Sequence, residues 1–321
     1  MRVRSLSGGA LVAIHRLDSI RIAVTDVAKQ SNFYDAVGLV SDSTRSRFSS
    51  PDRGEQVVVE EGDFRRLLSV GLSAMDESDL SVITSRLDGL GLSSTMRDDV
   101  LHAVDPGTRV DFTVHVGEPD IRPVSPLTAY NGPGRNERVN TRASGVIPHA
   151  RSPRRLGHVV IGTPDWEGTV RFLVEGLGFR VSDSFPGIIA FLRCSTDHHN
   201  VAVVGSEVPH LQHYSWECDD VDHVGHNATA LLNAKLAEQG WGFGRHYVGS
   251  NFFWYLLEPS GSFIEFYSDM DVITDDIEWE TRGRTPVGPE HIGNSWGPRM
   301  PLEFVIPHDL EELKAGWARI S

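Results

Sequence analysis

Three side chains in this sequence have the types and the spacing expected of a metal site: His158, His213 and Glu265. Each stands in a short apolar run that favours a β-strand, and roughly fifty residues separate each from the next. Two imidazoles and one carboxylate bind a divalent ion from one side and leave adjacent positions open, as is typical of non-haem Fe(II) sites. Spacing this wide excludes a single loop motif. The sequence therefore predicts that three separate strands converge on one point.

Length and composition set limits on what those strands belong to. A chain of 321 residues with 40% hydrophobic residues is long and apolar enough for two domains, or for one large domain built by duplication. The formal net charge is −14, and no block of consecutive lysines or arginines occurs. Because phosphate binding needs a clustered basic surface, we expect no nucleic-acid partner.

Cysteine usage and hydropathy indicate the compartment. Cys194 and Cys218 form neither a CxxC pair nor a disulfide framework, which suits a reducing environment. The basic N-terminal stretch has an apolar run too short for a signal peptide, and it is interrupted at His15 and Arg16. No window approaches the length of a membrane span. We expect a cytoplasmic protein without a membrane partner.

The chain repeats itself. The segment LDSIRIAVTDVAKQSNFYDAVGLVSDS, from Leu17, parallels LGHVVIGTPDWEGTVRFLVEGLGFRVSDS, from Leu156. Each reads as a strand, a turn containing an aspartate, a helix that ends at a glycine (Gly38 or Gly178), and a further strand. The pattern predicts an α+β fold of four β-α-β-β-β modules in two halves, each half forming an open, barrel-like sheet, with the active site in the second half.

Composition shifts predict the boundaries. Residues 1–118 form a first domain without metal ligands, residues 119–152 a connector rich in proline, glycine and arginine, and residues 153–270 the catalytic domain. Residues 271–321 form a tail that ends in a short helix near Asp309–Ile320, with Glu311 and Glu312 in its first turn.

The duplication supplies an internal control for the histidines. When the repeats are aligned, Ser19 takes the place of His158, Ser69 that of His213, and Asp111 that of Glu265. Strand packing alone therefore does not require histidine at these positions, which favours the metal-ligand interpretation. We interpret Asp111 as structural, because its two histidine partners are absent.

Five motifs in order carry a family resemblance. They are LGHVV at His158, FLxCxxxHH from Phe191 to His199, the strand LQHYSWECDD, GRH ending at His246, and YxxxPSGxxxE from Tyr255 to Glu265. With these motifs the chain resembles the type I extradiol dioxygenases of the vicinal oxygen chelate superfamily. The likeness covers the whole second half and, more weakly, the first.

The resemblance implies a role for each matching residue. His158, His213 and Glu265 would hold Fe(II) or Mn(II). His199, His246 and Tyr255 would be catalytic, with His199 as the acid–base residue. Val160 and Phe191, together with His246 and Tyr255, would bind the substrate. One departure is Val248-Gly249, where relatives carry an Asn-Asp pair; it changes the polarity of that loop and not the metal ligands.

The resemblance also implies the reaction and the partners. The expected activity inserts both atoms of O2 into a catechol-type diol, cleaving the ring beside the hydroxyl-bearing carbons, in a homo-oligomer. Two alternatives keep the fold: a non-oxidative metal-dependent lyase or isomerase, and a metal-free binding or resistance protein. The set of His199, His246 and Tyr255 argues against the first, and the intact ligand set argues against the second. We expect His198 and His210 to be ordinary strand-end or surface residues.

Overall fold

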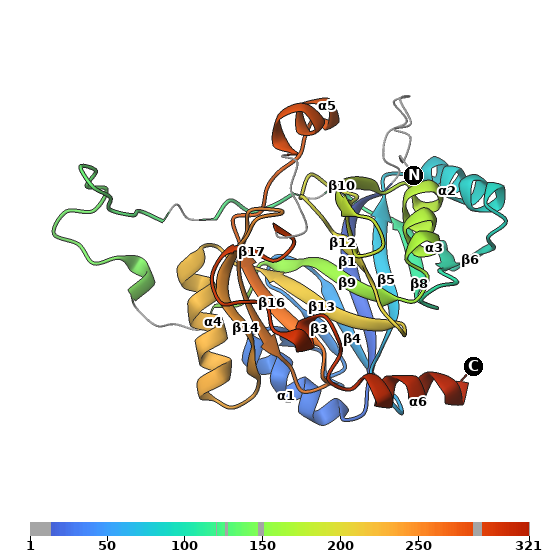
Figure 1. Ribbon diagram of the computed structural model, residues 1–321, viewed down its shortest axis with the longest axis horizontal. Helices are drawn as coiled ribbons and strands as arrows, with labels where there is room; N and C mark the ends of the chain where they lie inside the picture. Colours follow the sequence, from blue (N-terminus) through green and yellow to red (C-terminus); the bar gives the residue numbers. More distant parts are fainter. Residues whose placement is uncertain (1–13, 120, 126–127, 147–150, 285–290, 321) are drawn as a thin grey trace.

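A computed structural model gives the fold of the chain (Figure 1) and describes residues 14–119, 121–125, 128–146, 151–284 and 291–320. The first residues of the chain, for which no signal peptide is expected, lie outside these ranges, as do parts of the expected connector and tail. Within them, no helix is long and apolar enough to cross a membrane. Two large sheets and the helices that cover them make up the body of the molecule.

The first sheet has eight strands in the order β2-β3-β4-β1-β5-β8-β7-β6. Two helices belong to it, α1 (Val27–Val37) and α2 (Glu77–Gly89). Its strands are β1 (Ile14–Val24), β2 (Val40–Ser41), β3 (Arg47–Ser49), β4 (Glu55–Glu61), β5 (Arg66–Ala74), β6 (Ser94–Arg97), β7 (Val100–Val104) and β8 (Asp111–Val116).

The second sheet has nine strands in the order β10-β11-β12-β9-β13-β16-β15-β14-β17. Its first helical stretch is α3 (Trp166–Arg171) running into the π-helical turn η2 (Phe172–Leu177), and its second is α4 (Val221–Asn233). Its strands are β9 (Arg155–Thr163), β10 (Arg180–Phe185), β11 (Ile189–Arg193), β12 (Val201–Gly205), β13 (His210–Glu217), β14 (Glu238–His246), β15 (Phe252–Leu257), β16 (Phe263–Ser268) and β17 (Asn294–Trp296).

Each sheet is built from two β-α-β-β-β modules, which confirms the α+β class and the fourfold repeat. Local signals place the helices. The Asp26 side chain accepts a hydrogen bond from the backbone of Lys29 at the start of α1, and Asp165 caps α3 in the same way. Gly38 ends α1 and Gly178 ends η2, with φ of 92° and 89°, the left-handed conformation that favours glycine. Neither sheet closes into a barrel.

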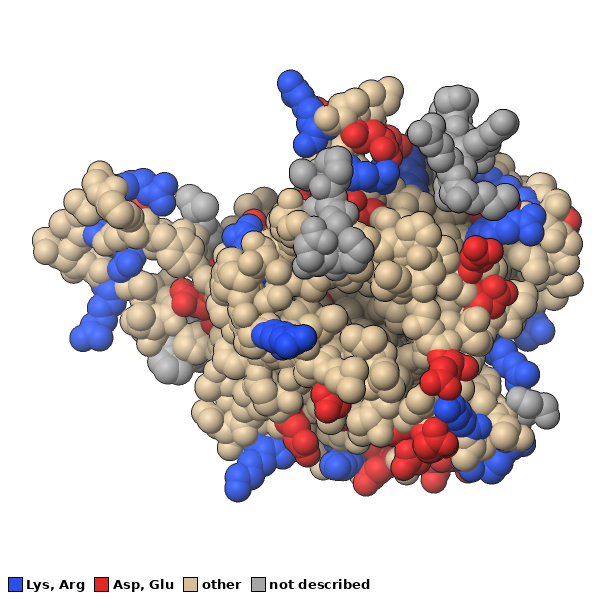
Figure 2. Space-filling view, viewed as in Figure 1, with Lys and Arg blue, Asp and Glu red and all other residues tan. Residues whose placement is uncertain are grey.

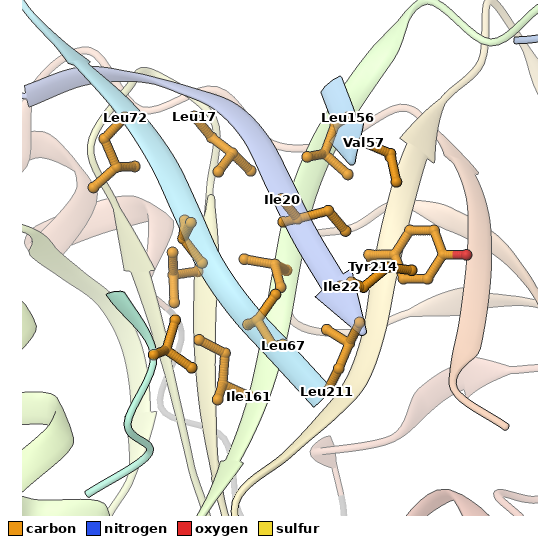
Figure 3. Packing of buried hydrophobic residues seen from close by; sticks show 14 of the residues in the cluster. Leu17, Ile20, Ile22, Val57, Leu67, Leu72, Leu156, Ile161, Leu211 and Tyr214 are labelled. Atoms are coloured by element: carbon orange, nitrogen blue, oxygen red, sulfur yellow. The ribbon is translucent and has the colours of Figure 1, made fainter. Parts of the chain in front are cut away.

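The two sheets share one apolar core. In Figure 3, side chains from β1 and β5, such as Ile20 and Leu67, face Leu156 and Ile161 of β9 and Leu211 of β13. The buried hydroxyls of Tyr34 on α1 and Tyr214 on β13 form a hydrogen bond of 2.9 Å across the same interface. The first half therefore supports the central strands of the second half directly.

Strand register corrects one part of the repeat alignment. Ser69 pairs with Asp111 between β5 and β8, whereas His213 pairs with Phe263 between β13 and β16. If Ser69 corresponds to His213, then Asp111 corresponds to Phe263, and Thr113 corresponds to Glu265. The alignment of Asp111 with Glu265 was wrong by two positions. It treated the segment before Asp111 as one residue shorter than the segment before Glu265, whereas the loop before β8 (105–110) is one residue longer than the loop before β16 (258–262). Hydroxyl residues thus replace all three candidate ligands in the first half.

The remaining elements lie outside the two sheets. They are η1 (Ser144–Val146), α5 (Asp276–Glu278), η3 (Trp279–Gly283), η5 (Leu302–Phe304) and α6 (Leu310–Ile320). Helix α6 confirms the expected terminal helix, and residues 128–146 of the expected connector extend away from the sheets (Figure 1). On the face shown in Figure 2, basic side chains are scattered among acidic and uncharged ones.

The shared core predicts that the two halves unfold together. Replacing the fully buried Ile161 with alanine should lower the free energy of unfolding by about 2–5 kcal/mol in one cooperative transition. Urea titration followed by tryptophan fluorescence and by circular dichroism measures this. Val40→Ala, at an exposed position of edge strand β2, is the control and should change little. Two separate transitions in Ile161→Ala would contradict a shared core.

Candidate metal centre

Three adjacent strands bring the candidate ligands together, as the sequence predicted. His158 lies on β9, His213 on the neighbouring β13, and Glu265 on the next strand, β16. The Nε2 atoms of the two histidines are 3.3 Å apart. Glu265 Oε2 lies 2.8 Å from His158 Nε2 and 3.6 Å from His213 Nε2. All three side chains are buried.

These separations suit a single ion. Ligand atoms about 2.1 Å from a metal and at right angles to one another stand about 3 Å apart. The three measured distances bracket that value, so the atoms can occupy one face of an octahedron. Within the described residues, this is the group of histidine, cysteine and acidic side chains whose ligand atoms come close enough to hold a metal.

Electrostatics keep the ligands in their metal-binding forms. Burial lowers the pKa of His213 well below its usual range, and the attraction of Glu265 offsets this only in part. His213 is therefore neutral at pH 7. Burial acting alone would raise the pKa of Glu265, but the facing His158 outweighs it and lowers that pKa to about 2. A neutral imidazole and an ionised carboxylate are the forms that bind metal.

Two polar residues that the sequence analysis missed complete the carboxylate's surroundings. Ser215 Oγ donates to Glu265 Oε2 at 2.6 Å and lies 2.5 Å from His158 Nε2. Asn251 Nδ2 donates to the other oxygen, Oε1, at 3.0 Å. The position of Ser215, two residues after His213 on the same strand, puts both side chains on one face. That alternation was the available signal for Ser215, whereas Asn251 lies just before β15 and had none.

His199 lies beside the triad and is held by a chain of hydrogen bonds. Its ring centroid is 4.1 Å from that of His158. His198 Nε2 lies 2.8 Å from Asp183 Oδ2, and His198 Nδ1 lies 3.0 Å from His199 Nδ1. Because the carboxylate accepts, His198 donates from Nε2, and its Nδ1 is the atom that can accept from His199. His199 then donates from Nδ1, so its Nε2 keeps a free lone pair.

Burial lowers the pKa of His199 well below its usual range, and the neighbouring His158 adds to this effect. The lone pair on Nε2 is therefore present at neutral pH. His198, read from the sequence as an ordinary strand-end histidine, is fully buried and makes the contact that sets this tautomer.

His246 and Tyr255 form a pair on the other side of Glu265. His246 Nε2 is 2.9 Å from the Tyr255 hydroxyl and 3.8 Å from Glu265 Oε1. Tyr255 lies opposite Glu265 in the register between β15 and β16. Burial lowers the pKa of His246 and raises the pKa of Tyr255 well above its usual value. Both groups are neutral at pH 7, so the tyrosine hydroxyl remains a hydrogen-bond donor.

An apolar cluster adjoins the histidines. Val160 and Phe191 pack with Ala202 and Val248, and the Phe191 ring lies 5.1 Å from the ring of His199. The unusual Val248-Gly249 pair falls in this region. Val248 extends the cluster, and Gly249 has φ of +87°, with His198 Nδ1 3.4 Å from where a Cβ would stand. The loop thus contributes apolar surface and a close approach of backbone to His198.

His210, considered from the sequence as a flanking residue, lies at the start of β13 outside the triad. Its Nδ1 is 3.1 Å from the carbonyl of Val208, and its ring packs against Gly162 on β9. Burial lowers the pKa of His210 to about 4. The two cysteines, Cys194 and Cys218, are free and buried, in agreement with the sequence.

Comparison with known proteins identifies the family. Residues 155–266 match the family described as Glyoxalase/Bleomycin resistance protein/Dioxygenase superfamily. The chain is 32% identical over 311 residues to Metapyrocatechase 2 of Cupriavidus necator, covering 91% of this chain and 92% of that protein. It is 24% identical over 298 residues to an iron-dependent extradiol dioxygenase of Rhodococcus jostii, covering 86% and 96% of the two chains.

A solved structure agrees at the level of the fold. The Mn(II)-bound glyoxalase from Novosphingobium aromaticivorans superposes with a TM-score of 0.70 at 23% identity, covering 93% of this chain and 95% of that one. With the relatives, this places the chain in the Glyoxalase/Bleomycin resistance protein/Dioxygenase superfamily, among its extradiol dioxygenases. The protein is an enzyme of the dioxygenase type.

The buried neutral histidines predict a pH dependence of the metal-free protein. A folded pKa below the unfolded value of 6.5 means that, as pH falls, the unfolded chain binds protons that the folded chain does not. Stability is therefore lost as pH falls from about 6.5 toward 4. His210 alone, with a pKa of about 4, should contribute a loss on the order of 3 kcal/mol across that window.

Urea titrations between pH 7.5 and pH 5 measure the effect. Burial raises the pKa of Glu258, which acts in the opposite direction, so the contribution of His210 is taken from the comparison with a variant. His210→Gln should show a shallower slope than the unmodified protein over the same range. Equal slopes in His210→Gln and the unmodified protein would contradict the neutral state of the buried His210 imidazole.

Proposed function

We propose that the protein is an Fe(II)-dependent extradiol dioxygenase that cleaves a catechol-type ring with O2. The observation that carries the proposal is the facial set of His158, His213 and Glu265, with His199 on one side and the His246–Tyr255 pair on the other. A metal in this set would supply adjacent positions at which a vicinal diol and O2 meet. Fe(II) is preferred because two histidines and one carboxylate are the donors of non-haem Fe(II) oxygenases.

The residues around the candidate ligands would have different roles in proton transfer and hydrogen bonding. His199, with a free lone pair at Nε2, would take a proton from a diol hydroxyl and return it to a departing oxygen. Its partner His198 and Asp183 hold that tautomer. Tyr255 and His246 lie at the edge nearest Glu265, and their mutual hydrogen bond would be exchanged for hydrogen bonds to the substrate oxygens. The non-oxidative members of the superfamily would not need this set.

Substrate binding is assigned to the apolar cluster. Val160 and Phe191 would contact the face and edge of the ring, with Val248 extending the same wall. Within this cluster the side chains are uncharged, which suits apolar ring substituents. The catalytic unit corresponds to residues 153–270, and residues 1–118 form its metal-free counterpart, in which Ser19, Ser69 and Thr113 occupy the ligand positions.

Reconstitution tests the proposal. Protein purified without oxygen is loaded with Fe(II), and in parallel with Mn(II), and is mixed with a panel of monocyclic and bicyclic catechols in air. We expect a yellow ring-opened product that contains both atoms of ¹⁸O2 by mass spectrometry. Stoichiometric metal with no turnover on the whole panel would favour the non-oxidative alternative, and failure to bind metal would favour the binding protein.

Removing a ligand and removing the base should have different effects. His213→Ala should lose both the metal and the activity. His199→Gln should retain the metal but lower kcat by about 10²–10⁴-fold, because only the proton transfer is lost. Metal analysis and steady-state kinetics of the same preparations measure both. His115→Gln, a half-exposed histidine of the first sheet, is the matched control. Loss of metal in His199→Gln would show that the roles are assigned wrongly.

The apolar wall predicts a change in substrate affinity. Phe191→Ala removes the ring that lies against His199 and should raise KM for catechols with apolar substituents by about 10-fold, with a smaller effect on unsubstituted catechol. Comparison of kcat/KM for the two substrates measures the selectivity. Equal losses for both substrates would argue that Phe191 supports the site without contacting the substituent.

A further inference from the structure

Residues 293–309, which we call the C-terminal strap, include β17, pass over the candidate metal centre and end where α6 begins. Phe304 of the strap stacks on His213, with ring centroids 5.8 Å apart, and meets Tyr255 edge-on at 4.7 Å. Trp241 is tied to the strap by a hydrogen bond of 2.8 Å to the carbonyl of Pro298. The strap therefore covers the side of the site that carries His213 and Tyr255.

One carbonyl of the strap orients His246. The carbonyl oxygen of Gly293 lies 2.8 Å from His246 Nδ1. A carbonyl only accepts, so Nδ1 carries the hydrogen and Nε2 faces the Tyr255 hydroxyl with its lone pair. The adjacent pairing of β14 with β17, His246 against Asn294, fixes this geometry.

A second carbonyl reaches His213 through Gln212. Gln212 Nε2 donates to the carbonyl of Phe304 at 2.8 Å, and Gln212 Oε1 accepts from His213 Nδ1. With its hydrogen on Nδ1, His213 presents the Nε2 lone pair toward His158 and Glu265. Neighbouring side chains on a regular strand point to opposite faces. Gln212 reaches its neighbour because it is the extra residue of a β-bulge against β9.

The first half of the chain contains the same bulge without the glutamine that links the strap to His213. In the first sheet the register between β1 and β5 slips at the corresponding point, and the extra residue there is Leu68. Leucine can neither accept from a histidine nor donate to a carbonyl. The bulge is thus present twice, and a glutamine occupies it only in the half that has the histidines.

Arg65, just before β5 of the first half, anchors the strap. Its guanidinium forms a bidentate pair with Asp309, at 2.6 and 2.7 Å. It also donates to the carbonyl of Leu211, next to the bulge, at 2.8 Å and to Ser262 Oγ, before β16, at 3.2 Å. Arg65 is only 6% exposed. One buried cation therefore joins the strap to the strand of His213 and to the turn that leads to Glu265.

We propose that the C-terminal strap is a positioning element of the metal centre that sets the orientation of His213 and His246. Arg65 anchors the strap through Asp309, and Gln212 connects the strap to His213. The inference rests on the proposed metal-dependent function. It gives the metal-free half a role in the site: it supplies the residue that holds the strap closed. Partners of metal-ligating histidines generally contribute 10–100-fold to metal affinity.

Gln212→Met tests the link from the strap to His213, because methionine keeps the length of the side chain and removes both hydrogen bonds. We expect metal affinity, measured by competition with a chelator, to fall by about 10–100-fold. The visible spectrum of the Co(II)-substituted protein should change, since it reports ligand geometry. The variant should still unfold in one cooperative transition, at a lower urea midpoint because the Phe304 carbonyl and the His213 Nδ1–H lose this partner. Circular dichroism matching that of the unmodified protein under the binding conditions separates positioning from loss of fold.

Arg65→Met and the milder Asp309→Asn test the ion pair between Arg65 and Asp309 that anchors the strap. Both should increase hydrogen exchange of residues 293–309 and weaken metal binding in the same direction as Gln212→Met. Should Arg65→Met not fold, Asp309→Asn still gives the answer, because Arg65 keeps its bonds to Leu211 and Ser262. Lys314→Met is the control: it removes the 2.9 Å exposed pair between α6 and Glu207 and should leave metal affinity unchanged.

Metal affinity and Co(II) spectra unchanged in both Gln212→Met and Asp309→Asn would overturn the inference. That outcome is distinguishable from failure of the proposed function. If the unmodified protein binds one metal per chain and His213→Ala loses it, the metal centre is supported and only the proposed role of the strap is rejected. If the unmodified protein binds no metal, both the proposed function and the proposed role of the strap are rejected.

Discussion

The structure depends on one constraint: two imidazoles and a carboxylate must meet inside a sheet without leaving an unpaired charge. Burying an ionised carboxylate is costly unless hydrogen bonds and opposite charge surround it. Here Glu265 receives hydrogen bonds from Ser215 and Asn251 and faces His158. Burial keeps His213 neutral, so the cluster is arranged to accept a cation. The fold around it serves to keep β9, β13 and β16 in the register that makes these contacts.

Duplication explains how a sheet can carry such a site. The apolar interface between the halves, which includes Ile20, Leu67, Leu156 and Leu211, holds the central strands in place independently of the ligands. The first half shows the same strands with Ser19, Ser69 and Thr113 in the corresponding positions. One repeat is therefore free to act as a support. Arg65 of the first half also contacts a strand of the candidate site, because it donates a hydrogen bond to the carbonyl of Leu211, close to His213.

The sequence was sufficient for the modules and for the meeting of the three candidate ligands, because both depend on residue type and spacing. Asp26 and Gly38 mark the ends of α1 by local chemistry, and His158 stands out against Ser19 in the repeat. The sequence was not sufficient where contacts depend on register. The loop before β8 is longer than the loop before β16, where the aligned motifs suggested a shorter one, so Asp111 stands two positions before the counterpart of Glu265. The roles of Gln212 and His198 depend on a bulge and on a buried hydrogen-bond chain. No periodicity in the sequence marks such features.

The most direct test of this account is a crystal structure of the anaerobic Fe(II)-loaded protein, with an anomalous difference map collected at the iron edge. The account predicts one iron per chain, bound by Nε2 of His158, Nε2 of His213 and a carboxylate oxygen of Glu265 on one face, with the remaining positions open to small ligands. Iron bound elsewhere, or an anomalous map without a peak between these three side chains, would contradict it.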